Sequence, residues 1–349
     1  MAEIWISWRN KMKRITIKTI AEQLGLSIAT VSRALQNSHE ISATTREKVK
    51  QAANELGYSP NVYASGLRAG SSKTIAVIVP EVENHFFSQV ISGVESIARL
   101  NNYHVLIYLT HEDPVKELEF VQLLGNGRAD GLLISVTHNG NGYAHLDQLV
   151  VANYPLVLFD RLVNELDVPK VSTNNEVISY EATRLLIERG AERIAFLGLN
   201  PDLYITRTRL AGYQKAVQQF RPGAEPMVFS GSGQPDEDIA RLKDFISIYQ
   251  PDAFLGASES MALLLYEISR QLGQSIPENY QLISFTNLAA ARFLSPSLAS
   301  IVQPAFEIGK EAAELLFKVI KKKKIYPAEA LPTLPSVIQE GDSIRTLRP

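Results

Sequence analysis

The alternation of apolar and amphipathic segments that begins at Thr74 restricts the fold of this chain more than any other feature. Short, almost continuously apolar runs predict strands buried on both faces, and longer segments with apolar residues at helical spacing predict helices. Together they predict parallel sheets covered by helices. The strands are Ile75–Val79, Val105–Leu109, Gly131–Ser135, Leu156–Phe159, Ile194–Gly198, Met227–Phe229, Ala253–Gly256 and Leu282–Phe285. The helices are Phe87–Leu100, Pro114–Leu124, Glu176–Arg189, Arg207–Phe220, Ser258–Leu272 and Phe306–Ile320.

The strands form two sets that divide near Asp160, which predicts an α/β domain of two doubly wound parallel-sheet lobes. A chain of 349 residues exceeds the usual size of one hydrophobic core, and 45% hydrophobic with 21% charged residues is typical of a folded, soluble protein. No apolar run is long enough to span a bilayer. The chain has no cysteine, which excludes disulfides and thiolate chemistry and favours a cytoplasmic location.

Before this region the sequence predicts a compact headpiece of three short helices. Thr16 is placed to cap Ile17–Gln23, and Ser27 to cap Ile28–Gln36 after a turn at Gly25. Ser42 then begins Ala43–Leu56, which Gly57 ends. Helix, tight turn and helix is the order of a helix-turn-helix.

Charge divides the chain at the same place. Residues 1–73 hold 11 basic and 5 acidic side chains, about +6, whereas the remainder carries about −8. A basic segment of this kind is what binding to a polyanion such as DNA requires, because each neutralised phosphate releases counterions.

The segment from Thr16 to Leu67, TIKTIAEQLGLSIATVSRALQNSHEISATTREKVKQAANELGYSPNVYASGL, resembles the headpiece of the lactose-repressor and galactose-repressor (LacI/GalR) family. A turn, a recognition helix SIATVSRAL, a third helix ending LGY before SPN, and a hinge leucine occur in the family's order. The resemblance continues through TIAVIVPEVENHFFSQVISGVES, ADGLLIS, RLAGYQKA and LSPSLASIVQP to about Glu340. It implies a DNA-binding regulator, a repressor in our interpretation, with a sensor domain like type I periplasmic binding proteins.

We expect the first residues of the recognition helix to face base edges in the major groove. Arg33 is suited to a guanine, while Ile28 and Ala29 offer apolar contact. Polar side chains suited to phosphate are Thr16, Thr30, Ser32 and Asn37. The headpiece core is expected to contain Ile20, Leu24, Val31 and Leu35.

The resemblance implies a hinge helix after the headpiece that orders on DNA. Asn61, Ala64, Leu67 and Arg68 are its expected DNA contacts, with Ala64 and Leu67 in the minor groove. The predicted boundaries are 1–14, a disordered extension; 15–58, the headpiece; 59–73, hinge and linker; 74–340, effector-binding and dimerisation domain; and 341–349, a tail.

The family pattern, carried across position by position, implies an effector site between the lobes, lined by Asn84, Phe86, Phe87, Asp160, Arg209, Ser258, Thr286 and Gln303. Phe86 and Phe87 can equally be lobe core. Two departures affect the ligand: Ser258 and Glu259 replace a common Asn-Asp pair, and Thr286 stands where many sugar binders have an aspartate. Because a carboxylate is lost there, the sequence favours a plain hexose less strongly as the effector, and a substituted, phosphorylated or oligomeric sugar is the alternative.

Two other classes of protein were weighed. An enzyme is disfavoured because the chain has no phosphate-loop, GxSxG or HExxH motif, and His104, His111, His138 and His145 lack metal-ligand spacing and are interpreted as surface residues. A secreted sugar-binding protein is disfavoured because a headpiece precedes the sensor domain and no secretory signal is recognisable. We therefore expect no catalytic residue, metal or cofactor.

The expected partners are double-stranded operator DNA, a small-molecule effector and a second copy of the chain. A homodimer would present two headpieces to the halves of a pseudo-palindromic operator. No heptad repeat follows Pro327, so a dimer is expected rather than a tetramer.

Gly66 and Ser65 occupy hinge positions where the family often has Ser and Arg. Glycine in a helix costs about 1 kcal/mol relative to alanine, so folding of the hinge should depend on DNA more than it does in typical members of the family. Hydrogen exchange of the free chain should show no slowed amides in the hinge, and addition of operator should slow them. A hinge fully protected without DNA contradicts this expectation.

Overall fold

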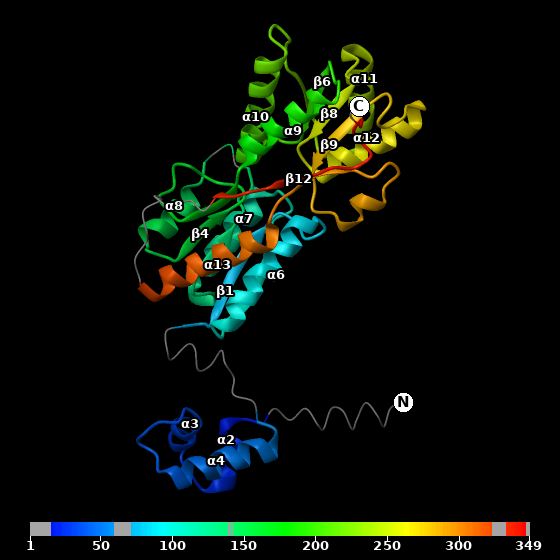
Figure 1. Cartoon of the computed structure of the whole chain (residues 1–349). Helices are drawn as coiled ribbons and strands as arrows, with labels where there is room; N and C mark the ends of the chain where they lie inside the picture. Colours follow the sequence, from blue (N-terminus) through cyan, green and yellow to red (C-terminus); the bar gives the residue numbers. More distant parts are fainter. Residues whose placement is uncertain (1–14, 59–70, 139, 141, 323–332, 347–349) are drawn as a thin grey trace. The chain divides into compact units, whose positions relative to one another are not determined.

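The computed structural model describes residues 15–58, 71–138, 140, 142–322 and 333–346 of the chain. It divides into two compact units, Met1–Ser72 and Lys73–Pro349, which are described separately below (Figure 1). The predicted extension 1–14 and the predicted hinge contacts Asn61, Ala64, Leu67 and Arg68 lie outside the described residues.

The first unit contains α2 (Ile17–Leu24), α3 (Ile28–Leu35) and α4 (Ala43–Leu56). The predicted caps are confirmed, because the side chains of Thr16, Ser27 and Ser42 each accept a hydrogen bond from a backbone N–H of the first turn. Gly25 ends α2 with φ of 65°, a left-handed conformation that permits the tight turn. The core contains Ile20 and Val31, with Leu24 and Leu35 packed against it, as predicted.

The second unit contains two sheets, each the centre of one lobe (Figure 1). The first sheet has the order β11-β5-β4-β3-β1-β2, with all its pairings parallel. Its strands are β1 (Thr74–Val79), β2 (His104–Leu109), β3 (Leu132–Ile134), β4 (Leu156–Phe159), β5 (Lys170–Thr173) and β11 (Thr333–Leu334). The helices of this first lobe are α6 (His85–Leu100), α7 (Pro114–Leu123), α8 (Ala144–Val151) and α13 (Ala305–Lys322), with a π-helical turn at Leu124–Arg128.

The second sheet has the order β12-β10-β9-β8-β6-β7, and only β12 is antiparallel to its neighbour. Its strands are β6 (Ile194–Gly198), β7 (Met227–Ser230), β8 (Ala253–Gly256), β9 (Gln281–Phe285), β10 (Ala299–Val302) and β12 (Val337–Gln339). The helices of this second lobe are α9 (Asn175–Glu188), α10 (Tyr204–Phe220), α11 (Pro235–Tyr249) and α12 (Glu259–Leu272), with a 3-10 turn at Ala289–Phe293.

The prediction that the lobes divide near Asp160 is wrong. β5 follows Asp160 in the chain but pairs with β4, so the first lobe continues to Thr173. The chain then crosses between lobes three times: after β5, after β10, and between β11 and β12. The first lobe is completed by α13 and β11, which follow nearly all of the second.

Each sheet is buried on both faces, as its apolar strands predicted. In the first lobe, α6 and α13 cover one face, while α7 and α8 cover the other. Figure 1 shows α13 lying beside α6. Their close approach depends on glycine, because a Cβ atom at Gly309 would lie 2.0 Å from the Val90 carbonyl oxygen, and one at Gly93 would lie 2.1 Å from that of Phe306.

Residues 341–346, predicted as part of a tail, pack on the second sheet. Ile344 is buried, and the buried Ser343 hydroxyl donates to the carbonyl of Leu282 at 2.6 Å. The domain therefore extends beyond Glu340. Within the residues that the structure describes, no helix combines the length and the apolar character needed to cross a membrane.

Substituting Gly309→Ala should destabilise the first lobe, because a methyl group must displace the backbone of α6. We expect a loss of about 1–3 kcal/mol in the free energy of unfolding, measured by urea denaturation. Gly125→Ala is the control, since no atom lies within 4 Å of the added methyl group. Equal stability of the two variants would show that α6 and α13 can separate without cost.

Candidate functional site

The first candidate site is the exposed side of α3 in the headpiece. Ser27 holds the start of α3 by accepting a hydrogen bond from the Thr30 amide at 3.0 Å. Ile28 is 49% exposed, and Ala29 is exposed beside it. Thr16, Arg33 and Asn37 are also exposed, while Thr30 and Ser32 are half-buried. These predicted DNA contacts therefore have side chains that can reach a partner.

Arg33 forms an ion pair with Glu40, with 3.2 Å between Nη1 and Oε2. Both side chains are more than half exposed, so solvent screens the pair and its contribution to stability is small. DNA can therefore replace Glu40 as the partner of Arg33 at little cost.

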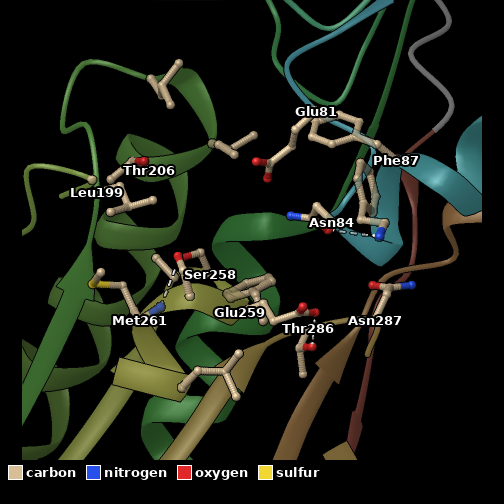
Figure 2. Close-up of a pocket in the computed structure, with 18 of the residues that line it drawn as sticks. Glu81, Asn84, Phe87, Leu199, Thr206, Ser258, Glu259, Met261, Thr286 and Asn287 are labelled. Atoms are coloured by element: carbon tan, nitrogen blue, oxygen red, sulfur yellow. Dashed lines mark hydrogen bonds between the residues drawn. The ribbon is translucent and has the colours of Figure 1, made fainter. Parts of the chain in front are cut away.

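The second candidate site is a cavity of about 490 Å³ lined by both lobes (Figure 2). It lies at the carboxyl ends of the strands, the usual position for ligands in open α/β sheets. All eight side chains predicted for an effector site line it: Asn84, Phe86, Phe87, Asp160, Arg209, Ser258, Thr286 and Gln303. Glu259, noted in the sequence as a departure from the family pattern, also lines the cavity, and several lining residues were not singled out: Glu81, Glu83, Glu112, Arg161, Asp238 and an apolar group that includes Leu199, Leu203, Ile205 and Met261.

Arg209 is buried and connects the segments where the chain crosses between lobes. Its Nε donates to Asn175 Oδ1 at 2.8 Å, just after the first crossing. Its Nη2 donates to Gln303 Oε1 at 3.0 Å, at the second crossing. Its Nη1 donates to the Ala257 carbonyl at 2.7 Å, and its guanidinium lies 3.8 Å from the centre of the Phe285 ring. Arg209 therefore fixes the cavity wall of the second lobe.

Asp160 contributes a buried carboxylate from the first lobe. Its backbone has φ of 59°, a left-handed conformation that aspartate tolerates better than most residues. Desolvation raises the pKa of Asp160, although Arg209, Arg161 and a hydrogen bond from Gln303 oppose that rise. Desolvation also lowers the pKa of Arg209 to about 10, which leaves the guanidinium charged at neutral pH.

The wall formed by the first lobe combines aromatic rings with an ion pair. Asn84 caps α6 by accepting a hydrogen bond from the Phe86 amide at 2.9 Å. Phe86 and Phe87 belong to the lobe core and also line the cavity, so the two alternatives for them do not exclude each other. Arg161 donates two hydrogen bonds of 2.7 Å to the Glu112 carboxylate, a bidentate pair at the edge of the cavity.

The expected loss of a carboxylate at Thr286 is compensated by a residue on another element. Thr286 Oγ1 donates to Glu259 Oε2 at 2.7 Å, so a carboxylate lies beside the hydroxyl (Figure 2). Glu259 is the first residue of α12, whose N-cap is Ser258. The sequence could not predict this contact, because it joins the end of β9 to the start of a helix 27 residues earlier.

The four histidines do not all lie on the surface. His145 is buried, with Nε2 at 2.8 Å from the fully buried Glu117 carboxylate, so its assignment to the surface is wrong. His104 and His111 are exposed, and His138 lies 3.7 Å from Asp202. Among the described residues, no group of three or more histidine or acidic side chains is placed to hold a metal ion.

Comparison with known proteins gives matches in both units. Residues 16–61 match the family of bacterial regulatory proteins of the lacI type, and residues 183–344 match a periplasmic binding protein-like domain. The HTH-type transcriptional repressor PurR of Vibrio atlanticus (strain LGP32) is 30% identical over 335 residues, which cover 95% of this chain and 99% of that protein.

Solved structures share the fold. The lac repressor dimer bound to operator and the anti-inducer ONPF has a TM-score of 0.81 at 22% identity. The match covers 96% of this chain and 100% of the lac repressor chain. The complex of the transcriptional regulator CelR with cellobiose has a TM-score of 0.71 at 25% identity. The match covers 95% of this chain and 100% of the CelR chain.

Asp160→Asn should change how stability depends on pH. Because the pKa of Asp160 is raised from 3.8 in the folded chain, proton binding there favours folding at acid pH. This contribution is lost as pH rises through the raised pKa. From about pH 4 to about pH 7, the melting temperature of Asp160→Asn should therefore rise relative to that of the natural sequence. Asp244→Asn, at an exposed position of α11, should follow the natural sequence. If the melting temperatures of all three proteins change with pH in the same way, the expectation is contradicted.

Proposed function

We propose that this chain, which belongs to the LacI family of bacterial regulatory proteins and is a DNA-binding transcriptional repressor, is controlled by a small molecule. The small molecule binds between the two sensor lobes and changes the affinity of the chain for operator DNA. The observation that carries this proposal is the cavity of about 490 Å³, to which both lobes contribute charged and aromatic side chains. A ligand there contacts both walls at once, so it favours one arrangement of the lobes over another.

DNA recognition by the headpiece follows from the side chains that α3 exposes. Arg33 reads a guanine through O6 and N7, and Ile28 and Ala29 contact apolar edges such as a thymine methyl group. Thr16, Thr30, Ser32 and Asn37 bind phosphates and set the register. Asn61, Ala64, Leu67 and Arg68 extend the contact through the hinge. The formal charge of about +6 over residues 1–73 supports this assignment.

The regulatory mechanism is thermodynamic linkage. If the effector favours one lobe arrangement, and that arrangement alters hinge order, then effector and operator change each other's affinity by the same factor. The crossing segments that Arg209 connects are the path for this coupling, because they join the two lobes directly. A homodimer would bring two headpieces to a pseudo-palindromic operator.

The effector is a sugar or sugar derivative. Aromatic rings at Phe86 and Phe87, beside polar groups from Asp160, Ser258, Thr286 and Gln303, suit a ring that carries hydroxyl groups. The bound cellobiose of CelR, a relative of similar fold, gives further support.

Gel shifts at several salt concentrations, with the DNA upstream of the chain's own coding sequence, test the proposed DNA contacts. Arg33→Ala should cost about 1–3 kcal/mol of specific affinity in a gel shift and relax the preference at one base pair, because only the base contact is lost. Lys18→Ala is the charge-matched control: it removes one positive charge from an exposed position of α2, so any loss of affinity should be similar for specific and non-specific DNA. If Arg33→Ala also weakens both equally, Arg33 is a phosphate contact and the assignment is wrong.

A further inference from the structure

We propose that the effector is a cation that carries a protonated amine, such as an amino sugar, and is not a phosphorylated sugar. This inference rests on the proposed function, since it concerns the ligand of the same cavity. It follows from the charges that line the cavity and from the partners that those charges already have.

Carboxylates outnumber cations in the described lining of the cavity. Glu81, Glu83, Glu112 and Asp160 come from the first lobe, and Asp238 and Glu259 from the second. The lining cations are Arg161 and Arg209. A ligand that enters therefore meets a net negative field, which attracts cations and repels phosphate.

Both guanidinium groups are already bound to acceptors within the protein. Arg161 uses its two terminal nitrogens for Glu112, and all three nitrogens of Arg209 donate to Asn175, Ala257 and Gln303. The terminal fork of Arg161 and all three nitrogens of Arg209 are therefore already occupied, and the buried Nε of Arg161 is the one guanidinium nitrogen of the two described side chains that has no hydrogen-bond partner. A phosphate would have to displace these bonds and overcome the surrounding carboxylates.

Glu81 is the carboxylate best placed for an amine. It follows β1, and Figure 2 shows its carboxylate pointing into the cavity, with Glu259 on the opposite wall. Glu81 forms no salt bridge with any described residue, whereas Glu112 is paired with Arg161. Desolvation and the charges of Glu112 and Glu83 raise the pKa of Glu81, although the charge of Arg161 and a hydrogen bond with the Asn84 side chain oppose that rise. A positive charge bound beside this carboxylate would stabilise its ionised form.

A metal ion does not fit the same charges. The described residues contain no group of three or more acidic or histidine side chains close enough to coordinate one. The apolar side chains of Leu199, Leu203, Ile205 and Met261 also line the cavity, and they suit the carbon framework of an organic molecule. The combination of acidic and apolar walls therefore selects an organic amine.

The test uses the full chain and matched trios of sugars: glucosamine, glucose and glucose 6-phosphate, with the corresponding galactose and mannose compounds. Dissociation constants are measured by calorimetry in low salt at about pH 6.5, where a sugar amine is protonated. In at least one trio the amine should bind about tenfold more tightly than its neutral sugar, and the phosphate should bind most weakly.

Glu81→Gln should lower this amine preference by about tenfold, because it removes the charge and keeps the shape. Glu119→Gln, at an exposed position of α7, is the matched control and should keep the preference. An unchanged ratio in Glu81→Gln, or a neutral or phosphorylated sugar bound as tightly as the amine in every trio, overturns the inference.

The outcomes separate this inference from the proposed function. If a neutral or phosphorylated sugar binds and changes operator affinity, the amine inference fails and the proposed function stands. If no sugar in the panel binds, the inference fails and the carbohydrate part of the proposed function fails with it. If the amine sugars bind without changing operator affinity, the inference stands and the regulatory proposal fails.

Discussion

The buried guanidinium of Arg209 is the interaction on which the sensor domain depends most. It bonds to residues at two of the segments that join the lobes, and it lies near the carboxylate of Asp160 across the cavity. Removing one member of such a network leaves the others buried without partners, which costs more than the bonds themselves contribute. The same group therefore maintains the lobe arrangement and occupies a wall of the cavity. A substitution at Arg209 would therefore affect both the stability of the domain and the shape of the cavity.

The parts of the fold that sequence predicted are those with strong periodicity. β1, β6 and β8 are uninterrupted apolar runs, so local pattern alone identifies them. β5 was missed because Lys170 and Thr173 dilute its apolar character, and its burial depends on pairing with β4. The lobe boundary was misplaced for the same reason, since a crossing between lobes is a property of strand order and leaves no local signal.

The candidate site was predictable where the resemblance to the family places a residue at a fixed position, as at Asp160 and Thr286. Residues whose surroundings depend on a partner far away in the sequence could not be predicted. Glu259 restores the carboxylate that Thr286 lacks, but only because α12 begins beside the end of β9. His145 was predicted to lie on the surface, because the sequence does not show that its buried partner Glu117, 28 positions away, lies beside it. Such pairs depend on tertiary proximity, which spacing in a single sequence does not encode.

The packing of α13 has a consequence for the order in which the chain becomes structured on the ribosome. Ile308, Ala312, Leu316 and Phe317 belong to the core of the first lobe, yet they are synthesised after β10. During synthesis the apolar face of α6 therefore stays uncovered until the strands and helices of the second lobe have been made. A premature stop before Ala305 would release a polypeptide with a complete headpiece and an open core, a species prone to aggregate. The segment that closes the core of the first lobe is therefore made only after nearly all of the second lobe.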